Sequence, residues 1–152
     1  MKHLLLILLL VPACCATRPT RPDPPVCKHG IMLAGTYTEA DATLLAHVLQ
    51  AFDAVGKTPP VCHTLTFVYD ESTAQKVLPT STHPGVWKYF RGFCRNETRA
   101  IYIRRFGPDL VDDYTYSLVI HEIAHAVGYT HGPDMEAFLG EVRAKYLEMY
   151  GN

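Results

Sequence analysis

Three histidines and one glutamate lie close together in the C-terminal third of the chain. The segment reads His-Glu-Ile-Ala-His-Ala-Val-Gly-Tyr-Thr-His and runs from His121 to His131. Because residues i and i+4 of an α-helix share a face, His121 and His125 can direct their imidazoles towards one metal ion. Gly128 stands where this helix must end, since glycine adopts the left-handed conformation that terminates helices. A turn at this point can bring His131 back beside the other two histidines.

Glu122 supplies the group that such a site needs for hydrolysis. Three protein ligands leave the fourth tetrahedral position of zinc open for water, as in catalytic rather than structural zinc sites. Glu122 lies about 100° around the helix from His121, so its carboxylate can accept a proton from that water and pass it to a leaving amine. The pattern therefore predicts one Zn²⁺ ion bound by the three histidines, with Glu122 as the general base. The His-Glu-x-x-His pattern together with Gly128 and His131 would occur by chance in only about one of ten thousand shuffled sequences.

These eleven residues resemble the zinc-binding signature of the zincin metallopeptidases, and the spacing to His131 resembles the metzincin branch. The resemblance implies hydrolysis of peptide bonds in peptide or protein substrates, with the three histidines as zinc ligands and Glu122 as general base. The methionine-bearing turn of metzincins is not evident, because Met135 follows His131 too closely and Met149 lies in an expected helix. The region after His131 is more similar to small zincins in which the third ligand directly precedes a closing helix.

Other residues could take some of these roles. The third ligand could be a carboxylate, Glu136 or Glu141, as in other zincin branches, although both lie off the apolar stripe of the last helix. His83 could be a fourth ligand or a solvated loop residue. Tyr129 could donate a hydrogen bond to a developing oxyanion or could serve in packing.

Hydrophobic periodicity, capping residues and chain breakers predict an alternation of strands and helices. The expected strands cover residues 31–37, 61–70, 86–94 and 99–106, the last two joined as a hairpin. The expected helices begin after Thr38, at Glu71, after Asp113 or Thr115, and at Pro133. Thr38 caps the first of them, with Asp41 at the third helical position as a weaker version of the capping box. This order predicts a small α+β, zincin-like domain with a mixed or antiparallel sheet, a buried active-site helix and a C-terminal closing helix. In zincins an edge strand pairs with an extended substrate, and either segment of the hairpin is a candidate for that strand.

The N-terminus predicts export. A charged start is followed by an apolar run, residues 4–11, that is too short to span a bilayer. We expect residues 1–16 to be a secretory signal peptide. Its end, Val-Pro-Ala-Cys, resembles a bacterial lipobox, which implies lipidation at Cys14; ordinary cleavage near Ala16 and secretion are the alternative.

The rest of the chain is expected to hold one domain. Residues 17–25 form a proline-rich tether, and residues 26–152 form the metallopeptidase domain. The location expected from the signal is the periplasmic or outer-membrane face of the cell envelope, with contact to the membrane only through the lipid anchor. A formal net charge of −1 favours neither nucleic acid nor an anionic membrane surface as a partner. Oligomeric state cannot be deduced from these features.

Cysteines outside the lipobox are expected to be structural. An oxidising compartment permits disulfides, and four cysteines allow three connectivities. Because two of them fall in expected strands, we predict a Cys62–Cys94 pair. The four cysteines are Cys15, Cys27, Cys62 and Cys94.

Two classes of function follow. The first is a zinc-dependent peptidase, and a related option is an amidase that applies the same chemistry to cell-wall peptides. The second is a non-catalytic exported lipoprotein that uses a zincin-like fold as a binding or inhibitory module. The presence of Glu122 favours catalysis, since a binding module has no need of a base beside the metal.

Overall fold

The structure is a computed structural model that describes residues 30–77, 90–105 and 113–151. The expected signal peptide, Cys14, the tether and His83 lie outside the described residues and stay predictions. No helix in the described ranges is long and apolar enough to cross a membrane.

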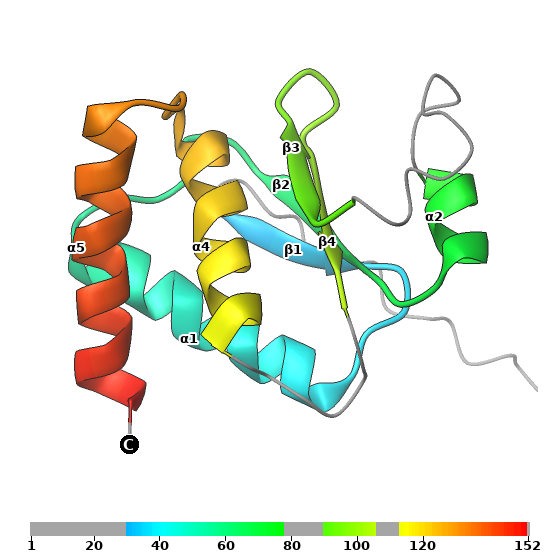
Figure 1. Cartoon of the computed structure of the whole chain (residues 1–152), viewed down its shortest axis with the longest axis horizontal. Coiled ribbons are helices and arrows are strands. Elements are labelled where there is room, and N and C mark those ends of the chain that lie inside the picture. Colours follow the sequence, from blue (N-terminus) through cyan, green and yellow to red (C-terminus); the bar gives the residue numbers. More distant parts are fainter. Residues whose placement is uncertain (1–29, 78–89, 106–112, 152) are drawn as a thin grey trace, which may run out of the picture.

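Four strands form one mixed sheet, in the order β1-β2-β4-β3 (Figure 1). The first three strands of this order run parallel, and β3 runs antiparallel to β4 at the edge. The predicted α+β class with a mixed sheet is therefore confirmed. The strands are β1 (Ile31–Ala34), β2 (His63–Val68), β3 (Gly92–Arg95) and β4 (Ala100–Arg104).

Four helices belong to the described part of the chain. In Figure 1, α4 lies between α5 and the β3–β4 side of the sheet, and α1 packs against both helices. The buried helix and the closing helix are thus confirmed, and Pro133 occupies the first turn of the closing helix as predicted. The helices are α1 (Glu39–Ala54), α2 (Glu71–Val77), α4 (Asp113–Val127) and α5 (Pro133–Tyr150).

The start of α1 is the capping box that the sequence predicts. The Thr38 hydroxyl accepts a hydrogen bond from the backbone N–H of Asp41, and the Asp41 carboxylate accepts one from the backbone N–H of Thr38. The prediction for Thr115 is wrong. Because α4 already begins at Asp113, Thr115 lies within its first turn, and its hydroxyl accepts a hydrogen bond from Arg105 instead.

The main core lies between one face of the sheet and the three long helices. Leu65 pairs with Ile101 and Phe67 with Ile103 across β2 and β4, so four buried apolar side chains share that face. Helices α1, α4 and α5 cover it with further buried residues, including Val48, Phe52, Ile120, Ile123, Phe138 and Val142. A smaller cluster with Val68 and Ala74 packs α2 against the other face. Burial of these apolar side chains is the main contribution to the stability of the fold.

The predicted Cys62–Cys94 pair is wrong. Cys62 is disulfide-bonded, whereas Cys94 is a free thiol. The strand order explains why the two cannot pair. Cys62 directly precedes β2 and Cys94 lies in β3, and β4 separates these strands. Two strand spacings amount to about 10 Å, which exceeds the Cα separation that a disulfide spans.

A fully buried ion pair joins α1 to the end of the sheet. The Arg105 Nε lies 2.8 Å from the Asp41 carboxylate, and neither side chain is exposed. Asp41 also accepts hydrogen bonds from Thr38 and from the Tyr69 hydroxyl, and the Arg105 guanidinium donates to Thr115 at the start of α4. Buried charges persist only when they are paired and hydrogen-bonded in this way. The cluster therefore holds the first turns of α1 and α4 together at one end of the sheet.

We expect the variant Arg105→Met to be destabilised by about 3–5 kcal/mol, because it leaves the Asp41 carboxylate buried without its partner. Denaturant unfolding followed by circular dichroism measures this change. The control is Lys145→Met, which removes an exposed i,i+3 pair with Glu148 and should cost no more than about 1 kcal/mol. If Arg105→Met lowered the free energy of unfolding by as little as the control does, the structural role of the buried pair would be contradicted.

Candidate metal centre

Helix α4 and the turn after it position the three histidines. Ile120, Ile123 and Ala124 are fully buried and anchor α4 in the core, whereas His121 and His125 remain partly accessible. The helix ends at Gly128, which has φ +117°, and its N–H donates to the carbonyls of residues 124 and 125. A side chain other than hydrogen is strained in this conformation. The predicted helix end is confirmed, and the turn leads directly through residue 131 into α5.

The three histidines converge. One ring nitrogen from each of His121, His125 and His131 lies within 4.8 Å of the others. The two Nε2 atoms of His121 and His131 are 3.2 Å apart. Two nitrogens bound to a tetrahedral zinc with bonds of 2.0–2.1 Å lie about 3.4 Å apart. The donor set and its spacing therefore fit a metal ion of the zinc type.

The backbone orients the ring of His125. Its Nδ1 lies 2.8 Å from the carbonyl oxygen of Tyr129, which can only accept a hydrogen bond. Nδ1 must therefore carry the proton, and Nε2 is left with a lone pair for a metal. A hydrogen bond of this kind is the usual partner of a metal-bound histidine.

His121 is held in the form that can bind a metal. Burial lowers the pKa of His121, and the neighbouring His125, His131 and Arg143 lower it further, while Glu136 acts in the opposite direction. A lowered pKa favours the neutral imidazole near neutral pH, and only the neutral ring can coordinate a metal.

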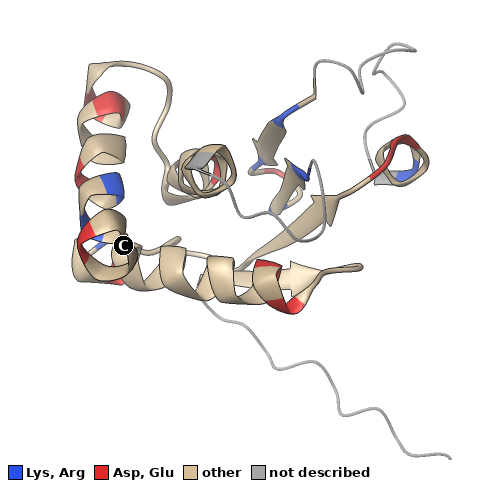
Figure 2. Cartoon of the chain, turned by 60° about the horizontal axis from the view of Figure 1, so that its bottom comes forward, with Lys and Arg blue, Asp and Glu red and all other residues tan. Residues whose placement is uncertain are grey.

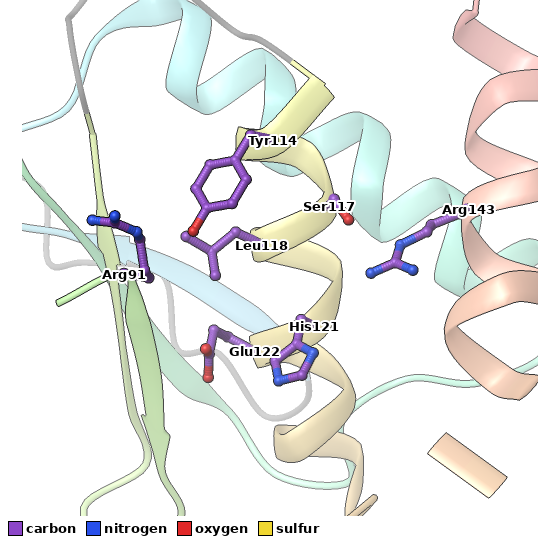
Figure 3. Close-up of a pocket in the computed structure, with 7 residues that line it drawn as sticks. All are labelled: Arg91, Tyr114, Ser117, Leu118, His121, Glu122 and Arg143. Atoms are coloured by element: carbon purple, nitrogen blue, oxygen red, sulfur yellow. The ribbon is translucent and has the colours of Figure 1, made fainter. Parts of the chain in front are cut away.

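Glu122 lies between α4 and the edge strand. Its side chain is buried, yet it lines the same open pocket as His121, and both project from one stretch of α4 (Figure 3). Burial raises the pKa of Glu122 to about 7, and a hydrogen bond from the backbone N–H of Cys94 opposes the rise. A carboxyl with this pKa can both accept and return a proton near neutral pH.

Gly92 makes room for this carboxylate. A Cβ atom at position 92 would lie 3.1 Å from both Cγ and Oε1 of Glu122, and 3.1 Å from the carbonyl oxygen of Tyr102. Such contacts are tighter than ordinary packing allows, so glycine permits β3 to approach α4. Sequence reasoning did not identify Gly92 or the amide of Cys94, because nothing in the local pattern shows which strand faces Glu122.

Asn96 links the hairpin turn to the end of α4. Its Nδ2 donates to the carbonyl of His125 at 3.2 Å, and its Oδ1 lies 3.1 Å from Nε2 of the buried His63. Only a protonated Nε2 can bond to that oxygen. This residue was also missed as part of the site, since its two partners are distant in sequence.

The other candidate residues do not join the three histidines. The Tyr129 ring stacks on Phe138 at a centroid distance of 4.3 Å, which is a packing role. Glu136 and Glu141 do not belong to the cluster of ligand atoms; among the described residues, the three histidines form the group that could hold a metal ion. Burial raises the pKa of the Cys94 thiol to about 12, with Glu122 and Glu97 adding to the rise, so this thiol is protonated and unreactive at neutral pH.

The β3 strand is the sheet edge beside the metal centre. Of the two segments proposed for substrate pairing, residues 99–106 form β4, which is covered on both sides by β2 and β3. That candidate is therefore wrong, because its backbone groups are already used within the sheet. Residues 86–94 overlap β3, which packs against α4.

Comparison with known proteins gives a distant match. No model of a known protein family matches the chain, and no curated protein does. Among solved structures, a mutant of Wss1 from S. pombe matches with 14% identity and a TM-score of 0.42, over 78% of this chain and 96% of that chain. A similarity at this level assigns no activity.

We expect His131→Ala to weaken zinc binding by more than about a hundred-fold, because it removes one of three donors. Zinc affinity is measured by competition with a chromophoric chelator. The control is His47→Ala, since His47 stacks on Tyr150 away from the cluster. Unchanged zinc affinity in His131→Ala would reassign the third ligand.

Proposed function

We propose that this protein is a zinc-dependent peptidase that hydrolyses peptide bonds in peptide or protein substrates. The observation that carries the proposal is the convergence of three histidine nitrogens beside a buried carboxylate that faces the same pocket. His121, His125 and His131 would hold one Zn²⁺ ion. Three neutral imidazoles are a common donor set for catalytic zinc, and they leave one position of the ion open.

The chemistry divides between the ion and the protein. When bound, zinc would lower the pKa of a water molecule and polarise the scissile carbonyl. Glu122 accepts the proton of the attacking water and returns it to the amine that leaves. The backbone N–H of Cys94 orients the carboxylate, and the carbonyl of Tyr129 holds the His125 ring in the tautomer that coordinates.

The edge strand would position the substrate. An extended peptide can add to the exposed edge of a sheet through main-chain hydrogen bonds, and its side chains then alternate between pocket and solvent. β3 is an edge strand that packs against the helix carrying Glu122. We therefore propose that the peptide lies beside β3, across the metal centre.

A non-catalytic binding module is the second candidate, because a metal-bound fold can also recognise a partner. The position of Glu122 favours catalysis. A buried carboxylate with a raised pKa costs stability, and a purely structural zinc site has no use for one on its open side.

Export and lipid attachment at Cys14 remain a separate proposal that rests on the N-terminal sequence. Membrane fractionation tests it. Wild type should be found with the membranes and Cys14→Ala in the soluble fraction; equal distribution of both would contradict the anchor.

We expect Glu122→Gln to keep stoichiometric zinc and to lower turnover by about two to four orders of magnitude, because glutamine cannot accept the proton. A digest of a peptide library first identifies a cleaved sequence, and metal analysis accompanies the rate measurement. Removal of zinc by a chelator should abolish cleavage, and its return should restore it. Equal turnover in wild type and Glu122→Gln would remove this residue from the mechanism.

Gly92→Ala should lower turnover by about ten-fold or more while zinc affinity stays unchanged. The added methyl group pushes the Glu122 carboxylate out of position, and small misplacements of a catalytic group are costly. Gly140→Ala is the matched control, because a Cβ at this exposed position of α5 meets no atom within 4 Å. Full activity in Gly92→Ala would show that the contact between β3 and Glu122 does not matter for the reaction.

A further inference from the structure

The pocket beside the metal centre has cationic walls. It has a volume of about 320 Å³ and extends from His121 and Glu122 along α4 past Leu118 to Tyr114. Arg143 of α5 forms one wall, and Arg91, the residue before β3, forms the opposite wall (Figure 3). The pocket is open, so a side chain of a bound peptide can enter it directly from the cleft.

The positive charges come from two separate elements. In Figure 2 the Lys and Arg positions of the β3–β4 hairpin lie on one side of α4, and those of α5 lie on the other. Burial lowers the pKa of the Arg104 guanidinium, and the charge of the nearby Arg91 lowers it further. Among the described residues that line the pocket, Glu122 is the single carboxylate, and it is turned towards β3 and bonded to the amide of Cys94. Glu136 acts on His121 from α5 but does not line the pocket.

Arg143 is the group best placed to bind an anion. Figure 3 shows its side chain extending from α5 towards Ser117 and His121. Its Nε is buried and has no hydrogen-bond partner among the described residues. A buried polar atom without a partner is rare in folded proteins, and a guanidinium in this state is suited to a carboxylate from a bound molecule.

The role of Glu122 decides which part of the substrate enters this pocket. In the proposed reaction, Glu122 returns a proton to the leaving amine, so the residue that supplies this amine lies on the Glu122 side of the metal. The pocket begins at Glu122 and continues away from the other two histidines along α4. The side chain that follows the scissile bond therefore points into it.

We propose that the pocket between Arg91 and Arg143 selects substrates with an acidic side chain directly after the scissile bond. This inference rests on the proposed peptidase function. Arg143 forms the direct ion pair with the substrate carboxylate, and Arg91 adds attraction from the opposite wall.

Cleavage of matched peptides tests the proposal. The zinc-loaded full chain is given internally quenched peptides that are amidated at the C-terminus and differ only in Glu, Gln or Lys after the scissile bond. Glu should exceed Gln in kcat/KM by about ten- to hundred-fold, as expected for a charge-assisted hydrogen bond, and Lys should be cleaved least. Equal rates for Glu and Gln would overturn the acidic preference and leave the peptidase function intact.

Substitutions at Arg143 separate recognition from folding. Arg143→Gln should remove most of the preference for Glu over Gln, and Arg143→Lys should keep part of it. Arg143→Glu should reverse the order in favour of Lys, which loss of structure cannot do. Arg91→Gln should reduce the preference by only about three-fold, because it acts at longer range. Arg95→Gln is the control, since Arg95 is an exposed residue of β3 outside the pocket, and a changed ratio there would contradict the assignment.

A binding measurement makes the result independent of turnover. Fluorescence anisotropy of the same peptides on zinc-loaded Glu122→Gln should show tighter binding of the Glu peptide than of the Gln peptide. If wild type binds zinc and cleaves no peptide, the proposed peptidase function is wrong. The binding measurement still decides whether the pocket prefers an acidic side chain. A preference that appears only with a free C-terminus would assign the pocket to the chain-terminal carboxylate and overturn the side-chain proposal.

Discussion

The contact between Glu122 and the backbone of β3 determines how α4 lies in this structure. Gly92 allows the strand to come close, and the amide of Cys94 bonds to the carboxylate. Rotation of α4 about its axis would leave this carboxylate buried without its hydrogen bond, which costs free energy. Because His121 and His125 lie on the same helix, the contact also sets the direction in which they meet His131. One polar contact at the sheet edge thus positions both Glu122 and two of the three clustered histidines.

The two ends of α4 are held by different means. At the start, the buried Asp41–Arg105 pair bonds to Thr115 and joins the helix to α1 and the end of β4. At the end, Asn96 bonds to the carbonyl of His125 and joins the helix to the β3–β4 turn. Both links are polar and directional, whereas the apolar contacts along the middle of α4 are not. A helix held in this way is a rigid base for ligands that must meet within a few tenths of an ångström.

In the proposed function, chemistry and recognition use different residues. Glu122 is buried against the sheet, where low dielectric raises its pKa and suits it to proton transfer. The guanidinium of Arg143 lies on the other side of α4, on a helix that begins just after His131. Since α5 supplies a pocket wall and none of the three clustered histidines, its pocket-facing side chains can vary without altering that cluster. Changes in the proposed selectivity are therefore compatible with an unchanged histidine cluster.

Features decided by neighbouring residues were predicted well. The short helix at residues 71–77, the capping box of Thr38 and Asp41, and the helix end at Gly128 all depend on contacts within a few positions. The predicted hairpin is confirmed as well, since β3 (Gly92–Arg95) pairs antiparallel with β4. The errors concern contacts between strands that are not neighbours: the pair Cys62–Cys94 is wrong because β4 lies between β2 and β3.

The sequence alone therefore determined the histidine cluster, since the i, i+4 spacing of His121 and His125 and the glycine before His131 are properties of one helix and its end. Only the tertiary structure decided what surrounds those donors. Strand order, the edge position of β3, the closeness of Gly92 to Glu122 and the placement of Arg143 arise from packing between segments that are far apart in the chain. No local pattern encodes these contacts, because each depends on how several elements bury their apolar faces together.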